Sequence, residues 1–331
     1  MRLLLLATVL LLNSCGLGKQ EPLWQSGMFS ADGKYYAYTY SETTITGIQK
    51  KGRATSRQGM ITNYLQIIDL STGEKILKKP YKSKGMLWLR EIEGSYIWLQ
   101  NLNISDGIST PILFDIASQK MKYTAEDLQK INPEIFAKST STFYKDTTTG
   151  MVSVEAADGR KYRIDPTSDK ARIATGNFER VQDKNFYCYQ TENSIKGIAT
   201  FGDTRKKLTK KENGNTLNSQ DDFINPKFLA IDKASLTSKS TATFYGDYFF
   251  VISDHSTTDK KDRQLSMLNQ NTLQSQWSIA IPQATQEMNN YDKERFFLYN
   301  NLLYVSNSTN LIIIDADKGT VTQTIALFTE K

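Results

Sequence analysis

The chain has 331 residues, and its formal net charge of +6 is spread along its length at an ordinary 23% charged residues. One histidine and two cysteines are too few for a zinc site built on several histidines or for a disulfide-stapled scaffold. No phosphate-binding loop, dinucleotide fingerprint or Gly-x-Ser-x-Gly elbow is present. Abundant tyrosine, phenylalanine and threonine beside few prolines favour β-strands.

The chain begins with a segment typical of secretion. Arg2 precedes an apolar run, Leu3 to Leu12, that is about half the length a membrane-spanning helix needs. The run ends in Leu12-Asn13-Ser14-Cys15, which resembles the lipobox of bacterial lipoproteins, although asparagine is unusual there. The resemblance implies cleavage before Cys15 and acylation of Cys15, palmitate included. The alternative is a plain signal peptide with a chance cysteine.

An acylated Cys15 would determine where the protein is located in the cell. Residues 1–14 are then a lipoprotein signal peptide and residues 15–22 a lipidated tether, and the membrane is a partner through Cys15. Gly16 replaces the aspartate that commonly retains enterobacterial lipoproteins at the inner membrane, which favours the outer membrane, facing the periplasm or the cell surface. Nucleic acid is not an expected partner of an exported lipoprotein. We expect Cys188, the other cysteine, to be a small buried side chain.

From residue 23 onward, short apolar and aromatic runs separated by turn residues predict strands. A Thr124-Ala125-Glu126-Asp127 capping box predicts one short helix that ends before Pro133. The individually predicted strands span 23–29, 35–40, 64–69, 75–77, 86–92, 95–100, 111–115, 141–145, 151–156, 161–164 and 171–174. Further strand-rich units are expected at 178–204, around 228–232, at 242–281 and at 296–327.

A turn motif recurs along the chain. An apolar residue followed by Asp or Asn and a polar turn occurs at Asp69, Asp115, Asp165, Asp232, Asn269 and Asp315. Its spacing of roughly 45 residues, with four strands per unit, is typical of β-propeller blades. The turns at Asp69 to Glu74 and Asp315 to Gly319 resemble those of WD-like and quinoprotein-like propellers. The signature dipeptides of WD repeats and a repeated tryptophan-docking motif are both absent.

The resulting prediction is an all-β fold, a six- to seven-bladed β-propeller of four-stranded antiparallel blades that occupies residues 23–331 as a single domain. The alternative is a β-sandwich or a pair of barrels.

Long connections are the expected place for binding, because loops on a rigid scaffold usually carry function. In a four-stranded meander, the second-to-third connections leave on the same side as the connections between blades. The expected second-to-third connections span 42–63, 101–110, 191–196 and 254–263, and those between blades 122–140, 206–222 and 282–294. We therefore expect any ligand to meet this side or the channel beneath it.

Two groups in these connections are candidate ligand- or partner-binding sites. The first is a basic, glycine-containing loop that could grip anionic lipid headgroups, lipopolysaccharide or an acidic protein patch, or could be a solvated insertion. It comprises Lys50, Lys51, Arg53 and Arg57. The second surrounds the single histidine and comprises Asp254, His255, Asp259 and Arg263. Adjacency in sequence rarely gives catalytic-triad geometry, so His255 is also consistent with a plain surface residue.

The remaining signals have simpler structural explanations. A second basic run at 205–211 has the same two interpretations as the first. Trp88 and Trp98 could stack on a sugar, but packing between blades explains them more simply. The aspartates at 315–317 and 254–262 lack a complete calcium-loop pattern. No cofactor, metal or catalytic residue is predicted.

The expected function is that of a non-catalytic, lipid-anchored envelope protein, in architecture similar to propeller lipoproteins that act as scaffolds in outer-membrane assembly. It would bind a protein or glycan partner through its long connections. The alternative is a propeller enzyme acting on glycans or other envelope substrates, as a glycosidase, a lyase or a quinone-dependent dehydrogenase. A calcium-stabilised adhesion module is a third option. The sequence leaves the oligomeric state open.

Overall fold

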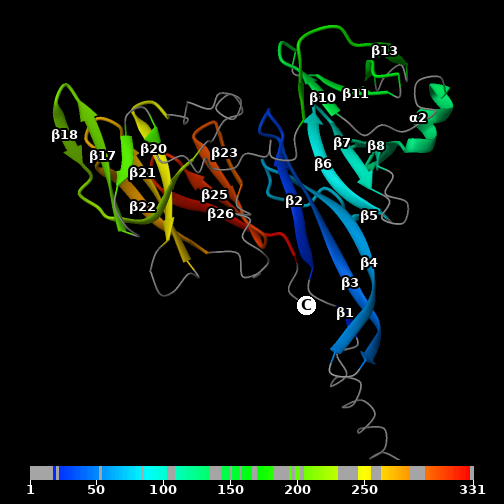
Figure 1. The fold of residues 1–331 in the computed structure, drawn as a ribbon, viewed down its shortest axis with the longest axis horizontal. Helices are drawn as coiled ribbons and strands as arrows, with labels where there is room; N and C mark the ends of the chain where they lie inside the picture. The colour runs from blue at the N-terminus through cyan, green and yellow to red at the C-terminus, as the bar shows by residue number, and fades with distance from the viewer. Residues whose placement is uncertain are drawn as a thin grey trace, which may run out of the picture. The chain divides into compact units, whose positions relative to one another are not determined.

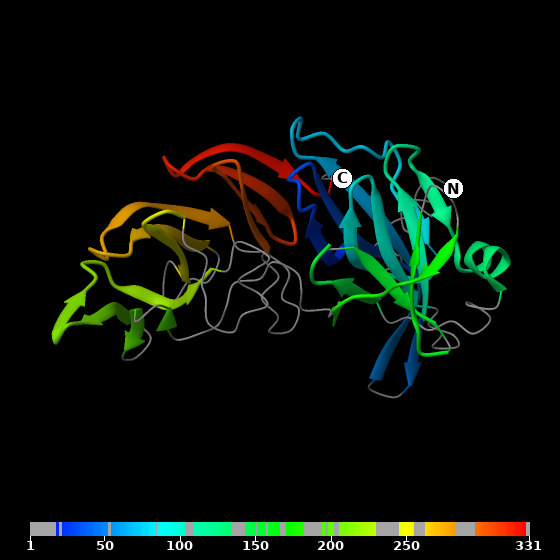
Figure 2. The same cartoon turned by 90° about the horizontal axis from the view of Figure 1, so that it is seen from above.

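We describe a computed structural model of the chain (Figures 1 and 2). The described residues are 18–19, 22–51, 54–83, 85–102, 109–133, 143–149, 151–156, 158–165, 170–181, 194–195, 198–201, 205–229, 245–254, 262–282 and 295–328. The chain divides into two compact units, Met1–Val181 (unit 1) and Gln182–Lys331 (unit 2).

Over its described residues, unit 1 contains three antiparallel sheets and one short helix. The first sheet is formed by β1 (Gly18–Lys19), β2 (Leu23–Phe29), β3 (Tyr35–Lys51), β4 (Ala54–Asp69) and β5 (Tyr81–Ser83). The second is formed by β6 (Met86–Glu93), β7 (Tyr96–Leu102), β8 (Ser109–Asp115) and β9 (Lys120–Tyr123). The third is formed by β10 (Phe143–Asp146), β11 (Val152–Glu155), β12 (Lys161–Ile164), β13 (Ala171–Ile173) and β14 (Phe178–Arg180).

The helix α2 (Ala125–Ile131) confirms the predicted capping box. The Thr124 hydroxyl accepts from the backbone N–H of Asp127 at 3.2 Å, and the Asp127 carboxylate accepts from the backbone N–H of Thr124 at 2.9 Å. The reciprocal bonds satisfy two N–H groups that a helix start otherwise leaves unpaired.

Unit 2 contains two antiparallel sheets over its described residues. The larger sheet is formed by β15 (Ser194–Ile195), β16 (Ile198–Phe201), β17 (Arg205–Glu212), β18 (Asn215–Asn218), β19 (Phe223–Phe228), β20 (Tyr248–Asp254), β21 (Asp262–Asn269) and β22 (Ser275–Pro282). The smaller sheet is formed by β23 (Arg295–Tyr299), β24 (Leu302–Ser306), β25 (Asn310–Asp315) and β26 (Thr320–Ala326).

The fold class predicted from the sequence is confirmed: over its described residues the chain is nearly all-β and contains four-stranded antiparallel sheets of the β-propeller type. β6–β9 and β23–β26 each pair in simple chain order, which is the meander of a propeller blade. The larger sheet of unit 2 combines two such groups, β15–β18 and β19–β22, which meet where β17 pairs with β19.

The recurring Asp/Asn turn links the third and fourth strands of the sheets. Asp69, Asp115, Asn269 and Asp315 each end a third strand, and in each case one side-chain oxygen accepts a backbone N–H two residues on. The fifth residue of every turn has positive φ: Gly73, Gln119, Leu273 and Gly319. These turns, with the positive-φ pair Asn300-Asn301 between β23 and β24, confirm the predicted reversals.

Cores form where neighbouring sheets of one unit pack together. In unit 1, Trp98 on β7 packs in a buried cluster with Leu113 and Phe143. In unit 2, Phe250 and Leu265 pack against Phe296, which belongs to the next sheet. Alternating apolar residues of successive strands are buried by this stacking, as the strand pattern requires.

Two segments expected to be loops are strands. Residues 42–63 continue β3 and β4, which pair from Tyr35↔Asp69 to Lys51↔Ala54 with one register shift, between Ile45 and Gly47. The segment is rich in β-branched threonine and isoleucine and contains no proline, so its polarity did not indicate a loop. Residues 206–222 likewise form most of the hairpin β17–β18, whose two-residue turn Asn213-Gly214 has positive φ at both positions.

One strand also belongs to a different unit from the one expected. Residues 178–204 were predicted as a single repeat, but β14 pairs antiparallel with β10 and adds a fifth strand to the third sheet of unit 1. The next sheet begins later, at β15.

Candidate functional site

The first candidate site lies on an extended hairpin of unit 1. β2 pairs with β3 as far as Leu23↔Ser41, and β5 pairs with β4 as far as Asn63↔Ser83. Beyond these positions, residues 42–51 of β3 and 54–62 of β4 continue to pair with each other; we call this segment the arm. At about 3.3 Å per residue the arm extends roughly 30 Å, and in both ribbon views it projects past the other strands of unit 1 (Figures 1 and 2).

The sequence-predicted basic residues lie at the far end of this arm. Lys50 pairs with Thr55, Lys51 with Ala54, and Arg57 with Ile48 in the backbone register. The structure therefore brings these three positions together, on paired strands instead of the expected loop. Arg53 lies outside the described residues.

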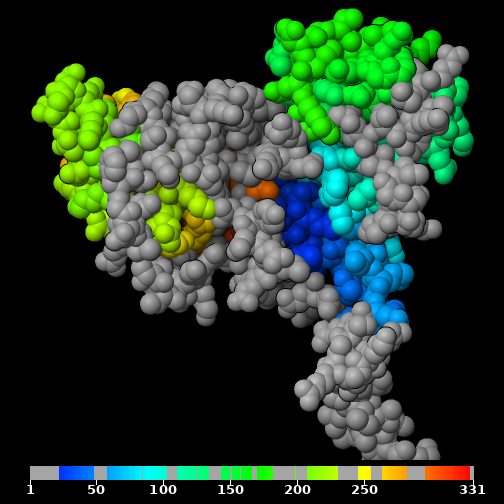
Figure 3. Space-filling view, viewed as in Figure 1, coloured from blue at the N-terminus to red at the C-terminus, as the bar shows by residue number. Residues whose placement is uncertain are grey.

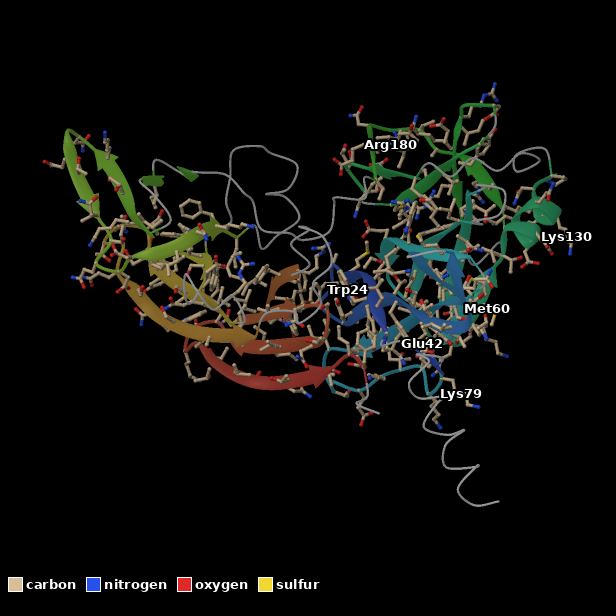
Figure 4. The ribbon with its side chains drawn as sticks, turned by 60° about the horizontal axis from the view of Figure 1, so that its bottom comes forward. Trp24, Glu42, Met60, Lys79, Lys130 and Arg180 are labelled. Atoms are coloured by element: carbon tan, nitrogen blue, oxygen red, sulfur yellow. The ribbon has the colours of Figure 1, made fainter. Side chains whose placement is uncertain are left out.

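The arm also exposes apolar side chains that sequence reasoning missed. Met60 is 60% exposed and Ile61 50% exposed, next to each other on β4. Figure 4 labels Met60 on β4 and Glu42 at the start of the arm on β3, and Figure 3 shows part of the arm's surface in blue. Exposed isoleucine beside exposed methionine is unusual in a strand whose inner part, at Leu65 and Ile67, is fully buried.

The second candidate site is a closed ion pair at the end of β20 and the start of β21. Asp254 and Arg263 are register partners, and Arg263 Nε lies 3.7 Å from Asp254 Oδ1. The other carboxylate oxygen of Asp254 accepts a hydrogen bond from Asn225 Nδ2 at 2.8 Å. The side chain of Arg263 is only 6% exposed. Both charges are thus engaged with each other at the base of the 255–261 connection.

The ligand-binding role predicted for this group stays a prediction. His255 and Asp259 lie outside the described residues. What the structure adds is that Asp254 and Arg263 fix the two strand ends from which that connection leaves, because a buried ion pair holds its partners in one geometry.

The aspartate of the Asp315 loop is committed to its turn. Oδ1 of Asp315 accepts the backbone N–H groups of Asp317 and Lys318, each at 3.1 Å, and Oδ2 accepts from Lys318 Nζ at 3.0 Å. The Lys318 side chain and these backbone N–H groups keep the pKa of Asp315 below its ordinary value. A catalytic acid needs a raised pKa, so this carboxylate is a turn-stabilising group.

Among the residues that the structure describes, no cluster of three or more histidine, cysteine or carboxylate side chains could hold a metal ion.

The tryptophans considered as a sugar platform differ from each other. Trp98 is 1% exposed and its ring contacts Phe143 edge-on, with centroids 6.1 Å apart, so it belongs to the core. Trp88 is half-buried, and the guanidinium of Arg90 lies 5.4 Å from the centre of its ring. The pair does not form one stacking surface.

A blade-to-blade contact in unit 2 was not predicted. Trp277 on β22 donates its indole N–H to the carbonyl oxygen of Ala316 at 2.8 Å, and its ring covers Gly319. The hydroxyl of Tyr245 donates to Asp317 Oδ1 at 2.6 Å, in the same turn. The sequence signal was the tryptophan eight residues after Asn269, in a chain without a repeated tryptophan motif.

A buried ion pair in unit 1 was also missed. Lys145 Nζ on β10 lies 3.0 Å from Glu91 Oε2 on β6, and the two side chains are 14% and 9% exposed. It links the second and third sheets, and only the folded arrangement brings the two residues together across 54 positions of sequence.

The remaining predicted positions cannot be placed. Cys15, the predicted lipidation site, and Cys188 lie outside the described residues. Over the described residues, no helix has both the length and the apolar character required to cross a membrane.

No protein-family model matches the sequence, and no curated protein sequence matches it significantly. Among solved structures, the chain is similar to apo AztD from Citrobacter koseri, at 12% identity over 92% of this chain and 86% of that one, with a TM-score of 0.26. It is similar to the β-propeller domain of the Trilobed protease from Pyrococcus furiosus, at 8% identity over 93% and 84%, with a TM-score of 0.27.

A third similar structure is BamB from Moraxella catarrhalis, at 14% identity over 94% of this chain and 91% of that one, with a TM-score of 0.20. TM-scores this low do not establish equivalent positions. The assignment to the propeller class therefore rests on the strand order and turns of this chain itself.

Proposed function

We propose that the protein is a non-catalytic, lipid-anchored component of the bacterial envelope, at the outer membrane, that binds a protein or glycan partner. The binding surface is formed by the second-to-third connections of its blades. Acylated Cys15 holds the chain at the membrane, and the blades act as a rigid support. The protein is thus a scaffold that binds its partner and catalyses no reaction.

The observation that supports the proposal most is the contrast between the two ends of the first sheet. The first-to-second and third-to-fourth turns are short and internally hydrogen-bonded, as at Asp69. The second-to-third connection of the first sheet is instead the arm, which extends roughly 30 Å. Additions of this kind at one end of a rigid fold are usual places for binding.

The anchor is tested by mass spectrometry of the N-terminal peptide and by fractionation of cells. We expect Cys15 to carry acyl chains, and Cys15→Ala to release the protein from the membrane fraction, because the acyl chains supply the membrane affinity. An unmodified Cys15 in a membrane-bound protein would contradict the anchor.

The binding surface is tested by photocrosslinking in whole cells. A benzophenone amino acid, which inserts into C–H bonds of proteins and glycans alike, replaces Thr110 at the connection end of the second sheet. Matched controls carry it at exposed Thr72 and Ser118 in the turns at the opposite end. We expect shifted bands only from the connection end. Bands from the turn end alone, or from neither end, would overturn the assignment of the binding surface.

A further inference from the structure

The arm has an unusual relation to the N-terminus. β1 pairs with the arm itself, through Gly18↔Ile45 and Lys19↔Thr44. The pairing is antiparallel, so the chain enters β1 from the side of the arm's tip and runs away from it toward β2. The arm is therefore the part of unit 1 to which the chain is attached directly after the predicted anchor.

The distance between the anchor and the arm is short. Three residues lead from Cys15 to Gly18, and a fully extended chain of three residues spans at most about 11 Å. An acylated Cys15 thus holds Gly18, and with it Ile45 of the arm, within about 11 Å of the membrane surface. Within β1, Gly18 lies nearer the tip than Lys19, so the tether from the anchor joins the arm at the tip-side end of β1.

The charge of the arm fits a membrane surface. From residue 43 to residue 68 the sequence contains no aspartate or glutamate, although 23% of the chain is charged. The basic residues Lys50, Lys51 and Arg57 lie on the paired strands near the tip. Each lysine or arginine close to an anionic bilayer strengthens binding about fivefold, provided it lies within a Debye length of the surface.

The arm also offers apolar contacts at the level of β1. Met60 pairs with Thr44, which in turn pairs with Lys19. Met60 and Ile61 are both at least half exposed, and among the described strands β4 gains a partner on its other side only from Asn63 onward, where β5 pairs. Apolar side chains between a lipid anchor and a basic tip are suited to the boundary between headgroups and acyl chains.

We infer that the arm is a second membrane contact, which binds anionic lipid headgroups and fixes the orientation of unit 1 on the bilayer. The inference rests on the proposed lipid anchor at Cys15. One acylated cysteine on a short tether leaves a protein free to tilt. The arm adds a second point of contact and so sets which surface of unit 1 faces away from the membrane.

The test uses the full-length protein, purified from membranes and reconstituted into vesicles. A polarity-sensitive fluorophore is attached at Met60→Cys in a Cys188→Ala background, so that only position 60 is labelled. Vesicles consist of phosphatidylcholine alone or of phosphatidylcholine with phosphatidylglycerol. We expect the emission to shift to shorter wavelength with phosphatidylglycerol, and the shift to disappear in 1 M salt, where the Debye length falls to about 3 Å.

Two variants separate the arm from net charge. The arm variant Lys50→Gln, Lys51→Gln, Arg57→Gln removes three charges. Binding of the arm to the anionic bilayer should then weaken about a hundredfold, and the emission shift should disappear. The matched control removes three charges from exposed lysines elsewhere in unit 1 and should retain it: Lys78→Gln, Lys79→Gln, Lys120→Gln. Equal melting temperatures show that all variants are folded.

The outcomes distinguish the two proposals. Protein that does not float with either vesicle type lacks the anchor, which overturns the proposed function and this inference together. Protein that floats but shows no shift with phosphatidylglycerol overturns the inference alone, as would an arm that recognises an acidic protein instead of lipid. An equal loss of the shift in the arm variant and the control would also overturn it, since the effect would then be one of overall charge.

Discussion

The contact between Trp277 and Gly319 makes a sharp stability prediction. Gly319 has φ of +66°, and a Cβ added there would lie 2.5 Å from both Cγ and Cδ2 of Trp277. We expect Gly319→Ala to destabilise unit 2 for two separate reasons. Alanine in the left-handed region costs about 1–2 kcal/mol, and the new methyl group must displace the indole ring.

The size of the second effect follows from what the ring does. Displacing Trp277 weakens its 2.8 Å hydrogen bond to Ala316, worth about 1 kcal/mol, and forced repacking adds about 1–3 kcal/mol. We therefore expect Gly319→Ala to lower the free energy of unfolding by about 3–6 kcal/mol in total. That is a large part of the roughly 5–15 kcal/mol by which domains are stable.

Calorimetry measures this effect, with Gly214→Ala as the matched control. Gly214 also has positive φ, +81°, in unit 2, but an added Cβ would meet nothing within 4 Å. The control should lose only the backbone cost, about 1–2 kcal/mol. Combining Gly319→Ala with Trp277→Ala should reduce the cost of the glycine substitution to the same value. Equal losses in Gly319→Ala and Gly214→Ala would refute the reasoning.

Two further predictions concern charge. Burial and the hydrogen bond to Asp317 raise the pKa of Tyr245 to about 12, above its ordinary 10. The folded state therefore keeps this proton to higher pH, so the contribution of Tyr245 to the free energy of unfolding is full below pH 10 and is lost between pH 10 and 12. Urea titrations should show that the free energy of unfolding falls less steeply over that window in Tyr245→Phe. An unchanged slope would contradict the prediction. Among the described residues, removing Arg263 leaves Asp254 with only its hydrogen bond from Asn225, and Arg263→Met should cost about 1–3 kcal/mol. Calorimetry of the single variant and of Arg263→Met with Asp254→Leu should show the double variant recovering much of this loss, whereas equal losses would argue against a charge penalty.

Local signals in the sequence predicted local structure well. The aspartates and asparagines at the ends of third strands marked turns, because their side-chain oxygens bind nearby backbone N–H groups whatever the rest of the chain does. Asp69 and Asp315 behave in this way, and so does Thr124 at the start of the helix. These interactions span only two or three residues, so the sequence contains all the information that they need.

The misassigned segments show where such reasoning failed. Residues 42–63 were interpreted as a loop because they are polar, yet threonine is polar and a strong strand former at once. Whether such a segment pairs is decided by the strand opposite, and here β3 and β4 supply each other's partners out to Lys51↔Ala54. The hairpin at Asn213-Gly214 was missed although its sequence is typical of a hairpin turn. The charged residues on both sides of the turn favoured a connection between blades instead.

Some features of the candidate sites could be found from the sequence, and others only from the structure. The basic residues of the arm were found from sequence, because clustered charge is visible there. Three features were not found from the sequence, because each depends on residues separated by many positions: the exposure of Met60, the ion pair Lys145–Glu91 and the pairing of β1 with the arm.

By itself the sequence determined the composition of the strands, the four-strand repeat, the turn chemistry and the resemblance to a lipobox. Each of these depends on neighbouring residues or on a short period. Only the tertiary structure decided which strands extend into an arm, which charges are buried in pairs, and that β1 returns to the arm close to the chain's start. Pairing between distant strands stabilises the fold only when both partners meet in register, and register is a property of the folded sheet.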